Sequence, residues 1–379
     1  DALTEEESPA LRYRLLGARG NTQRRLGRVQ EGTADFKLAI ALAETDGDQE
    51  RVATYIGNLG NIYIETGQAA EAEPYVLDSL ARMRALGNRH SEGVVLSDLG
   101  VICKQLGRAR ESEVHYRASL EILRELGDRV HLGVVVGNLA INHAELGELA
   151  DSRRLFEEAL QIHRAVGNRR PEGLTLSNLG QLAVQMGDLE AGKEFFRAAI
   201  KVHREIGNRR LHGVALGNLG VIWLREGDID AAERDLLEAL RIQDSVREQA
   251  TLTADLGAVR WRQGRLDEAL TLMNQGIALH AEAKNTFMHG YHLAFRGALE
   301  GVMGDHRAAS ASFDASMRWF DGQGDMLVEV LRAVADTHKD DADIGRIESV
   351  YADISARPPQ PGVGRALEIL RGALDVKAT

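Results

Sequence analysis

The sequence predicts an all-α fold: a solenoid of about eight two-helix repeats followed by C-terminal capping helices. Three observations support this prediction. A Leu-Gly motif recurs at a nearly constant spacing, a second glycine follows each copy at a fixed distance, and proline is scarce. Only six prolines occur in 379 residues, which favours helix because proline breaks the helical hydrogen-bond pattern.

The Leu-Gly motif lies within apolar segments such as "TLSNLGQLAVQMGD" at residues 175–188. Successive copies are 40 residues apart, except for the last pair of complete copies, which are 37 apart. Degenerate copies at both ends bring the number of units to eight. The anchors are Arg19-Gly20, Leu59-Gly60, Leu99-Gly100, Leu139-Ala140, Leu179-Gly180, Leu219-Gly220, Leu256-Gly257 and Arg296-Gly297.

A second glycine lies eight residues after the first residue of every anchor. It predicts the end of a first helix, because glycine readily takes the left-handed conformation that ends helices. Apolar residues then recur at helical spacings of three and four, as in Phe156, Ala159 and Leu160, which predicts a second helix. The glycines are Gly27, Gly67, Gly107, Gly147, Gly187, Gly227, Gly264 and Gly304.

Most units close with another glycine turn, in which the following Asn or Asp is a candidate N-cap for the next helix. The unit is therefore helix, turn, helix, turn. Such a pair cannot bury its apolar face alone, so neighbouring units stack into one continuous core. The closing turns are Gly87-Asn88-Arg89, Gly127-Asp128-Arg129, Gly167-Asn168-Arg169 and Gly207-Asn208-Arg209.

This pattern resembles the tetratricopeptide repeat family over about residues 11–325. The family carries Leu-Gly, an aromatic residue, a mid-repeat glycine and then alanines around a second aromatic residue. The unit of 40 residues is longer than the common unit of about 34 and is similar to that of Pins-type adaptors, kinesin light chains and bacterial sensory proteins. The resemblance implies a right-handed superhelix. Matching residues include Leu59, Gly60, Tyr63, Gly67, Ala72, Phe156, Ala159, Phe196, Ala199, Trp223, Ala232 and Ala239.

The repeat register divides the chain into five expected segments. An N-terminal segment (1–10) precedes the solenoid (11–325), and capping helices (326–356) follow it. The segment 357–364, "RPPQPGVG", reads as a linker because proline and glycine interrupt helices. A last helix (365–379) either caps the final repeat or occupies the groove.

Composition excludes several function classes. The formal net charge of −11 argues against general nucleic-acid binding, which requires an excess of basic residues. Cys103 is the single cysteine, so neither an intrachain disulfide nor a cysteine-based metal site is expected, which suits a cytoplasmic location. No run of about 18 apolar residues occurs, so we expect no membrane span.

Motifs for catalysis or for cofactors are not found in the sequence. "AGKE" (191–194) lacks the glycine spacing of a phosphate loop, and "GVGRAL" (362–367) fails the dinucleotide pattern. His289 and His292 have the spacing of two helical metal ligands, but no third ligand lies nearby in sequence. We therefore expect no enzyme, no cofactor, no catalytic residue and no metal site.

An asparagine or aspartate precedes the Leu-Gly pair in six consecutive units: Asn58, Asp98, Asn138, Asn178, Asn218 and Asp255. Asparagine is a mediocre helix former, but its amide offers a donor and an acceptor together, which matches a peptide group. The resemblance implies that the first helices line a concave surface, where this residue grips the main chain of a bound segment. The alternative is that these residues bond to the neighbouring helix and maintain the pitch of the solenoid.

Repeat geometry agrees with a peptide ligand. First helices of successive units should lie about 10 Å apart, and an extended peptide advances about 3.3 Å per residue, so one amide serves about three ligand residues. Apolar residues flank the row, as in Val94 and Val214. The predicted peptide-binding residues are Asn58, Asn61, Asp98, Val101, Asn138, Ile141, Asn178, Gln181, Asn218, Val221 and Asp255.

The sequence thus predicts a non-enzymatic protein-interaction scaffold that binds an extended peptide or partner segment in its concave groove. In that class it would be the sensing or docking arm of a larger signalling protein. The alternative is a structural or self-associating solenoid, whose groove holds its own tail (357–379) or another copy. The sequence leaves the oligomeric state open.

Two further features have two interpretations each. Arginines at the closing turns, Arg89, Arg129, Arg169 and Arg209, either guide an acidic partner electrostatically or neutralise helix ends and pair with Glu92 and Glu172. The 37-residue step falls where "IQDSVREQA" (242–250) replaces the glycine turn. The three missing residues must shorten a helix or the turn. The shortening either changes the pitch of the superhelix locally or has no structural consequence.

Overall fold

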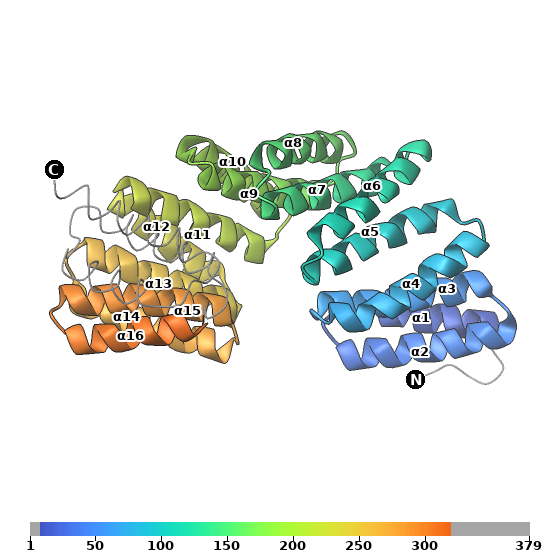
Figure 1. Cartoon of the computed structure of the whole chain (residues 1–379), viewed down its shortest axis with the longest axis horizontal. Coiled ribbons are helices and arrows are strands. Elements are labelled where there is room, and N and C mark those ends of the chain that lie inside the picture. The colour runs from blue at the N-terminus through green and yellow to red at the C-terminus, as the bar shows by residue number, and fades with distance from the viewer. Residues whose placement is uncertain (1–7, 320–379) are drawn as a thin grey trace. The chain divides into compact units, whose positions relative to one another are not determined.

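The computed structural model of the chain describes residues 8–319, and this part consists of sixteen α-helices without a strand (Figure 1). The predicted all-α repeat fold is confirmed, because each predicted repeat corresponds to two successive helices. The predicted capping helices (326–356), linker (357–364) and last helix (365–379) lie outside the described residues.

The helices group into two compact units, which divide after Leu182 near the end of α9. The first unit contains α1 (Pro9–Arg25), α2 (Val29–Asp46), α3 (Gln49–Glu65), α4 (Ala69–Ala85), α5 (Arg89–Gln105), α6 (Ala109–Glu125), α7 (Arg129–Glu145), α8 (Leu149–Ala165) and most of α9 (Arg169–Gln185). The second contains α10 (Leu189–Glu205), α11 (Arg209–Glu226), α12 (Ile229–Ile242), α13 (Val246–Arg262), α14 (Leu266–Glu282), α15 (Thr286–Val302) and α16 (His306–Trp319). Within each unit a helix packs mainly on the helices before and after it in the chain.

The turns between helices have the predicted chemistry. All eight mid-repeat glycines, from Gly27 to Gly304, have a positive φ, a conformation that disfavours residues with a side chain. The predicted N-caps are confirmed at Asn88, Asp128 and Asn208, whose side chains accept hydrogen bonds from backbone N–H groups of the first helical turn at 3.0–3.2 Å. Glycine therefore ends one helix, and the polar residue after the closing glycine starts the next.

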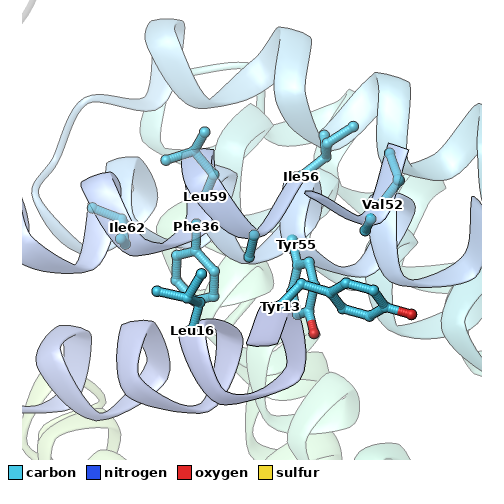
Figure 2. Packing of buried hydrophobic residues seen from close by; sticks show 10 residues of the cluster. Tyr13, Leu16, Phe36, Val52, Tyr55, Ile56, Leu59 and Ile62 are labelled. Atoms are coloured by element: carbon cyan, nitrogen blue, oxygen red, sulfur yellow. The ribbon is translucent and has the colours of Figure 1, made fainter. Parts of the chain in front are cut away.

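Successive repeats share a core, as Figure 2 shows for the start of the first unit. Leu16 of α1, Phe36 of α2, and Tyr55 and Leu59 of α3 are buried in one cluster. Tyr13 packs edge-on against Tyr55, with ring centroids 6.5 Å apart. Burying such a side chain stabilises the fold by about 1.5–3 kcal/mol, and here the stabilisation links two repeats.

The anchor glycine lets the two helices of one repeat approach closely. A Cβ atom at Gly60 in α3 would lie 2.6 Å from Cγ2 of Val76 in α4. Ser79, one turn further along α4, donates a hydrogen bond to the carbonyl of Ala53 at 2.9 Å. Leu59, the leucine of the anchor, is buried beside this contact. The Leu-Gly motif therefore combines a core residue with the point where the two helices cross.

The 37-residue step removes a turn from one helix. Helix α12 has 14 residues, against 17 in α10, and it ends in extended backbone at Gln243 (φ −86°, ψ 126°). The side chain of Gln243 donates to the carbonyl of Arg210 at 2.8 Å and so joins α12 to the preceding first helix. The expected shortening is confirmed, and the change of pitch stays a prediction.

None of the helices from α1 to α16 combines the length and the apolar character that crossing a lipid bilayer requires.

Two glycine substitutions in the first unit test the crossing point. We expect Gly60→Ala to lower the midpoint of thermal unfolding, because the new methyl group meets the stiff Val76 side chain at a cost of about 1–3 kcal/mol. The matched control is Gly137→Ala in α7, where the nearest atom to the added Cβ is 3.9 Å away. That change should raise the midpoint, since alanine favours helix over glycine by about 0.5–1 kcal/mol. Shifts of the same sign in the two variants would contradict the role assigned to the anchor.

Candidate peptide-binding face

The predicted asparagine row lies at the edge of the core in the first unit. Asn58, Asp98, Asn138 and Asn178 occupy the same position on α3, α5, α7 and α9, and each is half-buried. The leucine that follows each of them is buried. The row therefore stands beside the core rather than within it, and water or a ligand can reach it.

The asparagine amides of this row form no hydrogen bond with another part of the chain that the structure describes. Within residues 8–319, the side chains of Asn58, Asn138 and Asn178 have no hydrogen-bond partner. Asn142, one turn further along α7 than Asn138, behaves differently: it is fully buried and donates to the carbonyl of Ala109 at 3.0 Å. Ala109 begins α6 of the preceding repeat, so Asn142 forms the kind of bond between repeats that a structural asparagine makes.

Asp98 is the one carboxyl group of the row in the first unit. Burial, the largest influence, raises the pKa of Asp98 to about 7, against a hydrogen bond from Asn61 and the positive charge of Arg24, which both lower it. A protonated carboxyl group has one donor and one acceptor. Near neutral pH Asp98 therefore presents the same pair of groups as an asparagine amide for part of the time, and the row keeps its chemical character across α5.

An apolar strip runs beside the row. Val94 and Val101 on α5 and Ile141 on α7 are half-buried, whereas Val134 on α7 and Leu174 on α9 keep 40% and 38% of their surface exposed. Gln181 on α9 is exposed. The first unit thus carries a row of polar groups next to apolar side chains that are partly open to solvent.

The second unit has a pocket where its own predicted residues lie. Val221 of α11 and Asp255 of α13 line it, together with Arg225, Arg262, Tyr291, Phe295 and five further residues. Asn218, on α11, is half-buried. The sequence interpretation missed the two arginines, although Arg225 and Arg262 lie seven residues after Asn218 and Asp255 and therefore on the same face of their helices.

Two buried histidines lie behind this pocket. His292 lines the pocket, and its Nδ1 is 3.0 Å from Nε2 of His280. The two rings are stacked, with centroids 5.0 Å apart. Burial lowers the pKa of His280 to about 3, so this ring is neutral and the contact is a hydrogen bond between imidazoles.

Arginines at two of the closing turns pair with glutamates of their own repeat. Arg89 contacts Glu92 at 2.7 Å and Glu125 at 3.3 Å, and Arg169 contacts Glu172 at 2.5 Å. The predicted pairs with Glu92 and Glu172 are confirmed. Arg209 lies 4.0 Å from Asp244, and Arg129 has no ion pair within residues 8–319. Guidance of an acidic partner by these arginines stays a prediction.

The fold and this face define a helical-repeat protein with a polar row along its first helices. A family profile described as "Tetratricopeptide repeat" matches residues 11–85, 51–125, 91–165, 132–205, 171–245 and 213–282. These matches cover well over half of the chain. The chain belongs to the tetratricopeptide repeat family. The comparison with curated proteins gave no match.

Several solved structures have a similar fold. A signal transduction ATPase with numerous domains and a tetratricopeptide repeat sensor, from Pyrococcus horikoshii, aligns with a TM-score of 0.63 at 14% identity over 83% of this chain and 48% of that one. A Rap protein complexed with Competence and Sporulation Factor aligns with a TM-score of 0.62 at 15% identity, over 96% and 99% of the two chains. The apo quorum sensor NprR from B. thuringiensis gives 0.59 at 14%, over 96% and 98%.

At these identities the likeness shows the fold alone. The chain spans about half the length of the archaeal ATPase.

The raised pKa of Asp98 leads to a stability prediction. The folded pKa of about 7 lies above the unfolded value of about 3.9, so the folded protein binds more protons in this range. Its free energy of unfolding therefore falls as pH rises from about 4 to about 7. We expect Asp98→Asn to remove this loss and to stabilise the protein at pH 8 by about 1–3 kcal/mol, with little gain at pH 4. Thermal unfolding of both proteins across this pH range tests it, and a gain that is equal at both ends would refute the assignment.

Proposed function

We propose that the chain is a protein-interaction scaffold that binds an extended peptide or partner segment along the row Asn58, Asp98, Asn138 and Asn178. The observation that carries this proposal is the contrast within α7. Asn142 is buried and bonded to the preceding repeat, whereas Asn138 is half-buried without a partner among the described residues. A half-buried amide without a partner gains a hydrogen bond when a peptide main chain lies beside it.

The apolar strip supports the same ligand class. Main-chain hydrogen bonds contribute about 0.5–1.5 kcal/mol each, so the four groups of the row give a few kcal/mol together. Side chains of the ligand that bury Val134 and Leu174 add about 1.5–3 kcal/mol each. Association and ordering of the peptide offset much of this sum, and we expect micromolar affinity.

In the second unit, the pocket at Asp255 suits a different chemical group. Arg225 and Arg262 lie beside Tyr291 and Phe295, a combination that suits a carboxylate next to an apolar or aromatic side chain. This favours an acidic group on the peptide. The proposal treats the row and the pocket as two sites, each formed within one unit.

The broader role we propose is the sensing or docking arm of a larger signalling protein, without catalytic activity of its own and located in the cytoplasm. Two similar structures support it by their fold: a signal transduction ATPase with a repeat sensor and a Rap protein complexed with Competence and Sporulation Factor. The alternative occupants of the face are the last residues of the chain (357–379) and a second copy. A concentration-dependent increase in molecular mass on sedimentation would identify the second copy.

A pair of asparagine substitutions tests the peptide-binding face. Peptides selected against the full chain from a phage-displayed library, and measured by fluorescence anisotropy, provide the ligand. We expect Asn138→Ala combined with Asn178→Ala to weaken binding by at least about tenfold, since two main-chain bonds of about 1 kcal/mol each are lost. The melting temperature should stay nearly unchanged, because neither side chain has a hydrogen-bond partner among residues 8–319.

Asn142→Ala is the matched control. It removes a buried hydrogen bond between repeats, so it should lower the melting temperature, whereas peptide affinity should be retained below the unfolding transition. The opposite pattern, in which the double variant loses stability and retains affinity, would make the row a structural feature and would reject the proposed binding face.

A further inference from the structure

Two histidines and one aspartate converge in the first unit, at the N-terminal ends of α5 and α7. His90 belongs to the first turn of α5, Asp128 is the N-cap of α7, and His131 belongs to the first turn of α7. Nε2 of His90 and Nδ1 of His131 both lie 2.7 Å from the same oxygen, Oδ2 of Asp128. We call these three residues the histidine cluster.

The carboxylate of the cluster is held in place by the helix. Its other oxygen, Oδ1, accepts the backbone N–H of His131 at 3.1 Å, as an N-cap does. The two imidazole rings are nearly perpendicular, with an interplanar angle of 82° and centroids 5.3 Å apart. Two ring nitrogens therefore approach one fixed oxygen from different directions. The three ligand atoms can then surround a single ion.

We propose that the histidine cluster binds one Zn²⁺ ion and thereby joins two successive repeats. Two imidazole nitrogens and one carboxylate oxygen are ligands that zinc prefers, at about 2.0–2.2 Å from the ion. The three ligand atoms already lie within 4.8 Å of one another, so small rotations of the histidine side chains suffice. Without the ion, the nitrogens that face Asp128 donate hydrogen bonds to its carboxylate; when the ion binds, each neutral imidazole keeps its proton on the other ring nitrogen, and the freed nitrogen coordinates the ion.

Exposure of the two imidazoles suits an open site. The side chains of His90 and His131 are 52% and 45% exposed, so an ion can enter and water can complete its coordination. A single carboxylate with two imidazoles disfavours Mg²⁺ and Ca²⁺, which prefer sites made of oxygen ligands. The site therefore selects a transition-metal ion.

The same register positions hold an ordinary ion pair in the second unit. Arg210 corresponds to His90, and Glu248 corresponds to His131 when the 37-residue step is taken into account; their side chains are 2.9 Å apart. An arginine and a glutamate satisfy each other there. Between α5 and α7 both positions are histidines, His90 and His131. Two histidines cannot form such an ion pair, and both instead contact the carboxylate of Asp128.

A second group of metal-ligand types, Cys103, Glu111 and His115, provides a control. The Cys103 side chain is buried, whereas both histidines of the cluster are open to solvent, so an ion in solution reaches the histidine cluster and not Cys103. We expect no zinc binding at this group.

The test is a titration of the full, untagged chain with zinc at pH 7.5. Binding is measured by isothermal titration calorimetry and by competition with a chromophoric chelator. We expect one ion per chain with micromolar affinity, and no comparable binding of Mg²⁺. His90→Gln and His131→Gln should each weaken binding by at least about tenfold. Asp128→Asn should do the same while it keeps the helix cap, because asparagine caps as well as aspartate. His115→Gln should leave binding unchanged.

Thermal unfolding gives a second readout, since an ion that binds the folded state raises its stability by mass action. Excess zinc should raise the melting temperature of the wild-type chain by several degrees and leave the melting temperature of the His90→Gln/His131→Gln double variant unchanged. Circular dichroism confirms that the variants are folded. The proposal is overturned if the wild-type chain does not bind zinc, if the double variant binds it equally well, or if His115→Gln abolishes binding. None of these outcomes depends on the peptide-binding face.

Discussion

The structure depends on how closely the two helices of a repeat approach at a Leu-Gly anchor. Where Gly60 faces Val76, a single added carbon would collide, and the neighbouring leucine is buried by the same approach. Successive residues of a helix point about 100° apart. Once the leucine is fixed in the core, the residue before it must lie at the edge of the core. The packing of the anchor therefore decides where the asparagine row is presented, whatever the row binds.

The two kinds of asparagine on α7 show how one helix separates two tasks. Asn142 forms a hydrogen bond across the interface with the preceding repeat. Because this hydrogen bond is buried, it makes the packing of the two repeats specific. Between other repeats the same task falls to a glutamate enclosed by two arginines: Glu92 contacts Arg84 and Arg89 at 2.9 and 2.7 Å. These side chains join neighbouring repeats, whereas the asparagine amides of the row have no hydrogen-bond partner among residues 8–319.

Sequence reasoning recovered the features that repeat within one unit. The eight mid-repeat glycines, the caps at Asn88, Asp128 and Asn208, and the shortening near Gln243 follow from local conformational preferences, which are properties of short segments. It could not recover features made by two units. The histidine cluster joins residues 38 positions apart, and the raised pKa of Asp98 depends on how deeply its surroundings enclose it. The two pocket arginines, Arg225 and Arg262, could have been predicted from the sequence. They lie seven residues after Asn218 and Asp255, which places them on the same helix face.

Most helices contact helices no further away than the next repeat, and this has an evolutionary consequence. A stretch of 40 residues is a cassette that gene duplication or deletion can add or remove while the rest of the chain keeps its packing. Each such event would lengthen or shorten the row by one member, so the length of the row can change in discrete steps. The cassette that ends at Gln243 closes in extended backbone, and the Gln243 side chain bonds to the carbonyl of Arg210, so copying it would copy an irregular joint.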